Sequence, residues 1–162
     1  MTPLSLPLMH RHRVLPWIGG SGPGIPYLGK DTEGVAANQA VRSALVVDDE
    51  TLSRTVTGRM LVAEGFQVHE AASGKEALRY IETHPGTMLA VVDIVMPEMD
   101  GVTLASRLAE VAPACRIILM TGYAPTQVAL GTLIDRFSLL LKPFNQAELK
   151  SRILHVFKSG EH

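Results

Sequence analysis

The sequence has only one cysteine, Cys115, among its 162 residues. A single thiol cannot form an internal disulfide bond, and this is typical of proteins that fold in a reducing compartment. The basic residues 10–13 are followed by no apolar run long enough for a signal peptide, and no stretch approaches the roughly 18 apolar residues of a membrane-spanning helix. We therefore expect a cytoplasmic protein without a membrane segment.

The sequence also lacks an excess of charge of either sign. The chain has fifteen lysines and arginines and sixteen acids, for a net charge of −1 at neutral pH. A chain without an excess of positive charge has no general attraction to the phosphate backbone of nucleic acids or to anionic lipid. We expect no direct binding of nucleic acid and no membrane partner.

Hydrophobic periodicity is missing from the first 42 residues, which hold five of the ten prolines and six of the fourteen glycines. Such a composition cannot bury a face, so we expect residues 1–42 to be a disordered tail or linker. Residues 43–158 have the patterning of one domain of ordinary size, and residues 159–162 form a short C-terminal tail.

Within the predicted domain, short apolar runs alternate with amphipathic stretches. The predicted strands are residues 44–47, 66–70, 88–92, 116–120 and 137–141. The first helix is predicted from the spacing of Leu52, Val56, Met60 and Ala63, with Gly65 at its end. The other helices are predicted from a Ser73–Glu76 capping box, from Asp100 as an N-cap, over residues 124–134, and from Leu149, Ile153 and Val156.

Five strand–helix units predict an α/β fold with a doubly wound, five-stranded parallel sheet and helices on both faces. Four of the runs are almost entirely apolar, as expected for strands covered on both sides. The run at 66–70 alternates between apolar and polar residues, which is typical of an edge strand. We therefore expect the flavodoxin-like strand order 2-1-3-4-5.

Polar residues follow the carboxyl ends of four predicted strands. These residues are Asp48, Asp49, Glu50, Asp93, Thr121 and Lys142. Each alone has an ordinary explanation, since an acid after a strand often caps the next helix. The carboxyl ends of parallel strands meet at one edge of the sheet, however, where ligands bind. Their common position at this edge therefore predicts a ligand-binding site.

The chemistry of this set favours a metal and a phosphoryl group. Two carboxylates 4 Å apart repel by roughly 4 kcal/mol at an effective dielectric of 20. A hard cation relieves the repulsion, and a few carboxylates completed by water favour Mg²⁺. A carboxylate beside bound Mg²⁺ can attack phosphorus to give an aspartyl phosphate. The metal, a lysine and a hydroxyl would then share the phosphoryl oxygens.

The motifs VVDDE, VVDIVMPEMDG, MTGYA and LLLKPF resemble those of the receiver domain of two-component response regulators, over about residues 43–158. The resemblance implies that Asp93 is the phosphoacceptor. It also implies that Asp49 is a direct Mg²⁺ ligand, that Asp48 acts on the metal largely through water, and that Asp93 belongs to the same metal site. The residue two positions beyond the acceptor gives its backbone carbonyl to the metal in this family, and here that residue is Val95.

The same resemblance assigns roles to the other strand ends. Thr121 corresponds to the switch hydroxyl and Lys142 to the lysine that pairs with the phosphoryl group. A cis peptide bond is implied before Pro143, and Pro97 and Gly101 shape the loop after the acceptor.

The resemblance implies a signalling module that takes a phosphoryl group onto Asp93 from a sensor histidine kinase or a histidine phosphotransfer protein. Apart from self-catalysed transfer and autodephosphorylation we expect no enzyme activity, and output passes by contact to a downstream protein. One alternative is a Mg²⁺-dependent phosphatase with an aspartate nucleophile. Such enzymes commonly carry a second acid where this chain has Val95. Another is the receiver module of a hybrid histidine kinase.

Overall fold

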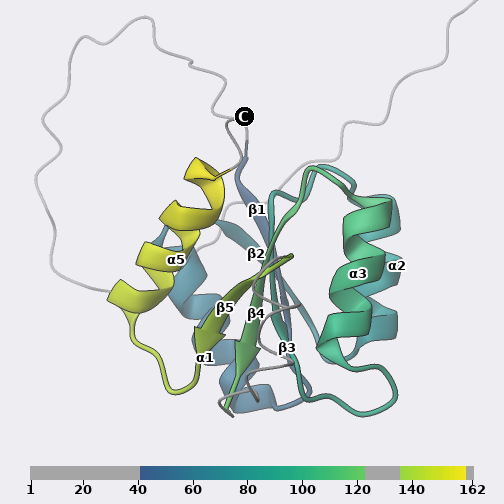
Figure 1. Ribbon diagram of the computed structural model, residues 1–162, viewed down its shortest axis with the longest axis horizontal. Helices are drawn as coiled ribbons and strands as arrows, with labels where there is room; N and C mark the ends of the chain where they lie inside the picture. The colour runs from purple at the N-terminus through teal and green to yellow at the C-terminus, as the bar shows by residue number, and fades with distance from the viewer. Residues whose placement is uncertain (1–40, 123–135, 160–162) are drawn as a thin grey trace, which may run out of the picture. The chain divides into compact units, whose positions relative to one another are not determined.

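The computed structural model describes residues 41–122 and 136–159 of the chain. They contain a five-stranded parallel sheet in the order β2-β1-β3-β4-β5, which confirms the predicted doubly wound fold (Figure 1). The strands are β1 (Ser43–Val47), β2 (Gln67–Ala71), β3 (Leu89–Asp93), β4 (Arg116–Thr121) and β5 (Ser138–Leu141). Each strand boundary lies within one residue of the boundary that the sequence predicts.

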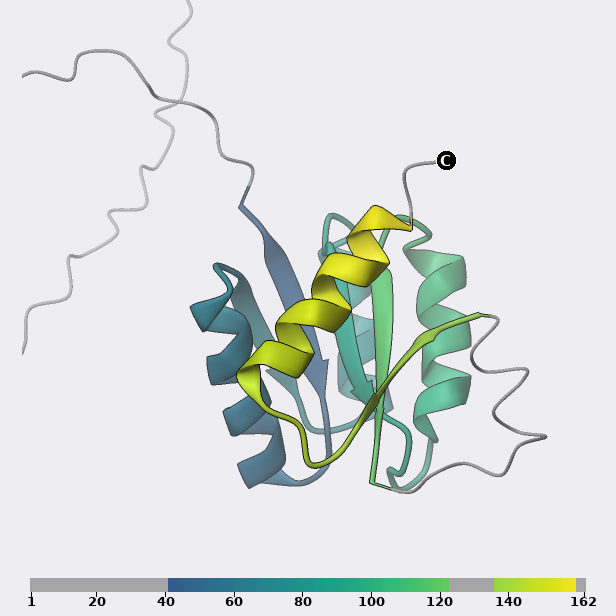
Figure 2. The ribbon, with the colours of Figure 1, turned by 60° about the vertical axis from the view of Figure 1, so that its left-hand side comes forward.

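Helices cover both faces of the sheet, as predicted. They are α1 (Thr51–Ala63), α2 (Gly74–Thr83), α3 (Gly101–Val111) and α5 (Gln146–Lys158). Figures 1 and 2 show α1 and α5 on one face and α2 and α3 on the other. Each face of the sheet has its own cluster of buried apolar side chains. The helix predicted over residues 124–134 lies outside the described residues.

The helix ends follow the capping signals in part. Asp100 accepts hydrogen bonds from two backbone amides of α3, and Gly65 ends α1 with a φ of 86°, as predicted. The predicted capping box of α2 is only half formed. The Ser73 hydroxyl accepts from the Glu76 amide, but the Glu76 carboxylate accepts from Ala72 rather than from Ser73. The reciprocal box occurs instead at the start of α5, where the sequence reading missed it.

The helix α1 is confirmed, but the apolar residues whose spacing predicted it do not form its buried face. Leu52 is 71% exposed and Val56 is 42% exposed. The buried residues of this helix are Thr57, Gly58 and Leu61. A Cβ atom at Gly58 would lie 2.9 Å from Oε1 of Glu70 on β2, so the helix approaches the sheet through its smallest residue. Part of the apolar stripe of α1 therefore faces solvent.

The sheet register brings the carboxyl ends of the inner strands level. Val47 pairs with Val92, Asp93 pairs with Met120, and Thr121 pairs with Leu141. The acids that follow β1, the aspartate that ends β3 and the lysine that follows β5 therefore reach the same edge.

The start of the described chain contacts the domain. The Arg42 guanidinium lies 4.2 Å from the centre of the Phe66 ring, and the Arg42 carbonyl accepts a hydrogen bond from the Gln67 amide at 2.8 Å. Residues 1–40 of the predicted tail and residues 160–162 lie outside the described residues. Among the described helices, none has the length and apolar character needed to cross a bilayer.

Candidate functional site

Lys142 connects the two buried acids at the edge of the sheet. Its Nζ atom lies 2.8 Å from Oδ2 of Asp48 and 2.5 Å from Oδ2 of Asp93. Asp48 is fully buried and Asp93 is nearly so, whereas 22% of the Lys142 side chain is exposed. The lysine follows β5 and precedes a cis peptide bond to Pro143, as predicted. One ammonium group thus holds two carboxylates that come from different strands.

Asp48 receives hydrogen bonds at both carboxylate oxygens. Its Oδ1 accepts from the Glu50 amide at 2.9 Å, and its Oδ2 accepts from the Ser53 hydroxyl at 2.6 Å in addition to Lys142. The sequence reading missed Ser53. The only signal for it was the position of a hydroxyl in the first turn of the helix that follows the acids.

Burial and hydrogen bonding act in opposite directions on the charged pair. Burial raises the pKa of Asp48, but the hydrogen bonds from Lys142, Ser53 and the Glu50 amide lower it by more. Burial lowers the pKa of Lys142, but its bonds to Asp48 and Asp93 raise it by more. The pKa of the acid is therefore below its usual value and that of the lysine is above, so both are charged at neutral pH.

The loop after Asp93 is folded tightly against the end of β3. Oδ1 of Asp93 accepts a hydrogen bond from the Val95 amide at 2.9 Å, and the Gly101 amide donates to the Ile94 carbonyl at 2.9 Å. A Cβ atom at position 101 would overlap the backbone carbonyl oxygen of Asp93. Only glycine permits this approach, which explains its place at the start of α3.

The remaining predicted residues surround this centre at different depths. Thr121 ends β4 in a buried position, and its carbonyl accepts a hydrogen bond from the Lys142 amide at 2.8 Å. Asp49 is exposed at the rim, directly after Asp48. The structure therefore brings Asp48, Asp93 and Lys142 into direct contact and joins Thr121 to the lysine through the backbone.

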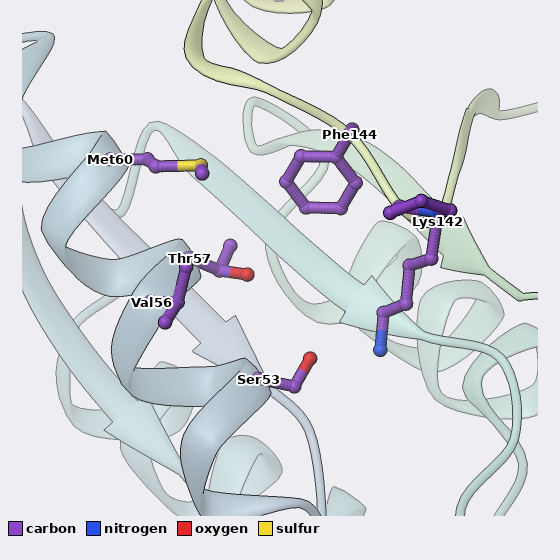
Figure 3. Close-up of a pocket in the computed structure, with 7 residues that line it drawn as sticks. Ser53, Val56, Thr57, Met60, Lys142 and Phe144 are labelled. Atoms are coloured by element: carbon purple, nitrogen blue, oxygen red, sulfur yellow. The ribbon is translucent and has the colours of Figure 1, made fainter.

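A cavity of about 350 Å³ opens beside Lys142, between α1 and the segment after β5. Its walls are mostly apolar and include Val56 and Met60 from α1 and Phe144 from the segment after β5. In Figure 3 the Lys142 amine and the Ser53 hydroxyl point toward one another from opposite walls. The cavity thus joins an apolar surface to the polar centre.

Arg54 ties the acidic centre to the edge strand. Its Nη1 atom donates to the backbone carbonyl of Asp48 at 2.7 Å, and its Nε atom lies 3.5 Å from Oε2 of Glu70. One side chain of α1 therefore joins the end of β1 to β2.

Comparisons with known proteins agree with this geometry. The family model of the response regulator receiver domain matches residues 44–154. The sensor kinase CckA of Brucella abortus is 40% identical over 121 residues, which cover 74% of this chain and 13% of the kinase. The chain therefore spans only a small part of that relative. The response regulator receiver protein CpdR of the same organism is 33% identical over 116 residues, which cover 70% of this chain and 94% of CpdR.

A solved structure has the same fold. The crystal structure of a CheX–CheY–BeF3–Mg complex from Borrelia burgdorferi aligns with a TM-score of 0.66 at 28% identity, covering 74% of this chain and 92% of that one. The family model matches more than half of the chain, and the fold and the polar strand ends agree with it. The chain belongs to the response regulator receiver domain family of two-component signalling.

Proposed function

We propose that Asp93 accepts a phosphoryl group from the phosphohistidine of a histidine kinase or a histidine phosphotransfer protein. The observation that carries the proposal is the contact of Lys142 with both Asp48 and Asp93. It holds a carboxylate at the end of the central strand beside a fixed positive charge and a second acid. This arrangement is suited to a nucleophile that must receive a highly charged group.

In the proposed reaction an oxygen of Asp93 attacks phosphorus. The new phosphorus–oxygen bond forms while the phosphorus–nitrogen bond breaks, and the electron pair of the broken bond returns to the donor imidazole. The Lys142 ammonium pairs with a phosphoryl oxygen as negative charge gathers there. In this proposal the hydroxyl of Thr121, a residue buried at the end of the neighbouring strand, donates to another phosphoryl oxygen.

The residues at this edge fit Mg²⁺. Within residues 41–122 and 136–159 no three Asp, Glu, His or Cys side chains are gathered as a ready cluster. Mg²⁺ needs no such cluster, because it usually takes one or two carboxylates and keeps several waters. Asp49 and Asp93, with the Val95 backbone carbonyl, would hold it directly, and Asp48 would act largely through water. When bound, the ion would offset the charge of the phosphoryl oxygens.

The surface around the acids favours a protein as the phosphoryl donor. Leu52 at the start of α1, Val95 in the loop after β3 and Leu141 at the end of β5 are 71%, 60% and 55% exposed. Exposed apolar side chains that frame a polar centre are typical of a protein-binding surface. The downstream partner would likewise be reached by contact.

Two alternatives use the same nucleophile. A phosphatase would place a second acid two residues after Asp93, but the side chain there is that of Val95, which cannot move a proton. The likeness to part of a sensor kinase also fits a receiver module within a hybrid kinase, in which Asp93 would have the same role.

The test is to incubate the full chain with Mg²⁺ and a radiolabelled phosphodonor, and to compare it with Asp93→Asn and Asp100→Asn. We expect the wild type and Asp100→Asn to be labelled, because asparagine also caps a helix well. Asp93→Asn should fold but carry no label. Labelling of Asp93→Asn at the wild-type rate would exclude Asp93 as the acceptor.

A further inference from the structure

Ser53 shares one atom of the site with Lys142. The Ser53 hydroxyl lies 2.6 Å from Oδ2 of Asp48, and the Lys142 ammonium lies 2.8 Å from the same oxygen. We infer that Ser53 is a positioning residue for phosphoryl transfer, whose hydroxyl holds Asp48 in place as Lys142 turns toward the phosphoryl group. This inference rests on the proposed function of Asp93.

The direction of the Ser53 hydrogen bond is unusual for a helical serine. A serine hydroxyl in the interior of a helix can donate to a backbone carbonyl one turn earlier. Ser106 does so on α3, where its hydroxyl donates to the Val102 carbonyl at 3.1 Å. Ser53 is half-buried like Ser106, but its hydroxyl donates to a carboxylate of the site. Its contact therefore serves Asp48 rather than the helix.

The burial of Asp48 gives this contact its importance. The side chain has no exposed surface, so an oxygen that loses a donor cannot replace it with bulk water. A buried acceptor without a partner costs far more than one that water can reach. Oδ2 of Asp48 therefore depends on its two protein donors.

A phosphoryl group on Asp93 attracts one of these donors, the Lys142 ammonium. It brings new negative charge to the far side of the Lys142 ammonium, and the amine moves toward that charge at the expense of its bond to Asp48. With Ser53 present, Oδ2 keeps one hydrogen bond throughout. Without it, Oδ1 keeps the Glu50 amide but Lys142 is the last donor to the buried Oδ2, and the lysine is held back.

The prediction is a slower transfer in Ser53→Ala. Acetyl phosphate with Mg²⁺ serves as the probe on the full chain, and the rate of labelling is the readout. Hydrogen bonds to charged groups contribute enough to change a rate about tenfold, and we expect a slowing of that size. The matched control is Ser106→Ala, which removes the same hydroxyl from α3 and should be labelled at the wild-type rate.

A second pair of variants separates the hydroxyl from side-chain size. Ser53→Thr and Ser53→Val are nearly equal in volume and differ in the hydroxyl alone, and the cavity beside Ser53 gives room for both. We expect Ser53→Thr to be labelled within about twofold of the wild type, and Ser53→Val to be about tenfold slower. This comparison remains informative if Ser53→Ala folds poorly.

A double-mutant cycle tests the path of the effect. In an Asp48→Asn background the buried charge is gone, so Ser53→Ala should slow labelling little further. Equal slowing in both backgrounds, or wild-type rates for Ser53→Ala and Ser53→Val, would overturn the role of Ser53. Labelling of Asp93→Asn would instead overturn the proposed function, so the two failures are distinguishable.

Discussion

Lys142 and Asp48 are 94 positions apart in the chain, and the lysine ammonium lies 2.8 Å from the aspartate carboxylate. β3 and β4 separate their strands in the sheet, so the lysine side chain reaches across the ends of two strands. The contact therefore requires the whole sheet to be assembled. It links the phosphoryl-transfer centre to the integrity of the fold.

The charge of Lys142 should stabilise the protein when no divalent cation is present. Lys142→Met keeps most of the stem and removes the ammonium, leaving two carboxylates with no positive partner. We expect a loss of about 1–3 kcal/mol in the free energy of unfolding, which allows for the partial exposure of the lysine. Urea unfolding in the presence of a chelator measures this loss, and added Mg²⁺ should recover part of it.

The control for that measurement is Lys150→Met. Lys150 is largely exposed and lies 3.7 Å from Glu64, so its loss should cost less than about 1 kcal/mol. Equal costs for the two variants would mean that the Lys142 contacts contribute no more than a surface ion pair.

Metal binding should distinguish two neighbouring acids. Asp49 is a proposed Mg²⁺ ligand, while Glu50 is the N-cap residue of α1 and makes no side-chain capping bond. Asp49→Ala should weaken Mg²⁺ binding by tenfold or more, on the order of one lost charged ligand. Glu50→Ala should leave it within about twofold. Calorimetric titration with Mg²⁺ is the measurement, and a larger effect at Glu50 would place the ligand one position later.

Gly101→Ala should disturb the loop that carries the acceptor. The added Cβ would overlap the Asp93 carbonyl oxygen and lie 2.8 Å from the Ile94 Cα atom, so the backbone must move. We expect a loss of about 1–3 kcal/mol, as for other overpacking substitutions, together with slower labelling. Gly86→Ala is the control, because a Cβ there meets nothing within 4 Å. Similar thermal midpoints for the two variants would argue against a tight loop.

The pKa shifts of the charged pair predict where stability depends on pH. The folded pKa of Asp48 lies below its ordinary value of 3.8, so its contribution is present above that pH and is lost as the pH falls through the folded value. The folded pKa of Lys142 lies above its ordinary value of 10.5, so its contribution is present below that pH and is lost as the pH rises through the folded value.

Urea midpoints measured from neutral pH to below the ordinary aspartate pKa of about 3.9 test the loss of stability on the acid side. Asp48→Asn should show a shallower fall in stability toward low pH than the wild type. The pKa of Asp100 is also lowered, by hydrogen bonds from Thr103, so Asp100→Asn is the matched comparison. If stability fell toward low pH as steeply in Asp48→Asn as in the wild type, the ion pair with Lys142 would not be what holds the Asp48 carboxylate in its charged form.

The exposed apolar rim should matter to a protein donor and not to a small one. Leu52→Gln should leave the thermal midpoint nearly unchanged, because Leu52 is mostly exposed. It should slow labelling by a phosphorylated histidine kinase several-fold, since exposed anchors of this kind carry part of a protein contact. Labelling by acetyl phosphate should be unaffected. Val62→Gln changes an exposed residue at the other end of α1 and should affect neither donor.

The sheet and the identity of the central acids were predictable because they depend on simple periodic rules. Apolar runs of strand length indicate the strands, and the polar residues that end them reach one edge of any parallel sheet. The orientation of α1 was not predictable in this way. The buried residues of α1 are Thr57, Gly58 and Leu61, two of which are not apolar side chains, and a count of apolar residues on a helix does not reveal such a face.

The role of Ser53 was not predictable from the sequence for a related reason. A serine in the first turn of a helix ordinarily indicates a local backbone contact. Its actual partner is the Asp48 carboxylate, which Lys142 also contacts from a strand at the other edge of the sheet. Contacts that need two distant segments to be in place first are invisible to local patterns.

Arg54 connects the edge strand β2 to the backbone of the acids that follow β1. Its guanidinium contacts both the Asp48 carbonyl and the Glu70 carboxylate, so a movement of β2 away from α1 would disturb a side chain that also contacts the backbone at the end of β1. Amide protons of β2 and of residues 48–50 should then exchange with deuterium as one cooperative unit. A protein that binds the open edge of β2 would then change the position of the Asp48 carboxylate through Arg54, without contacting that carboxylate itself.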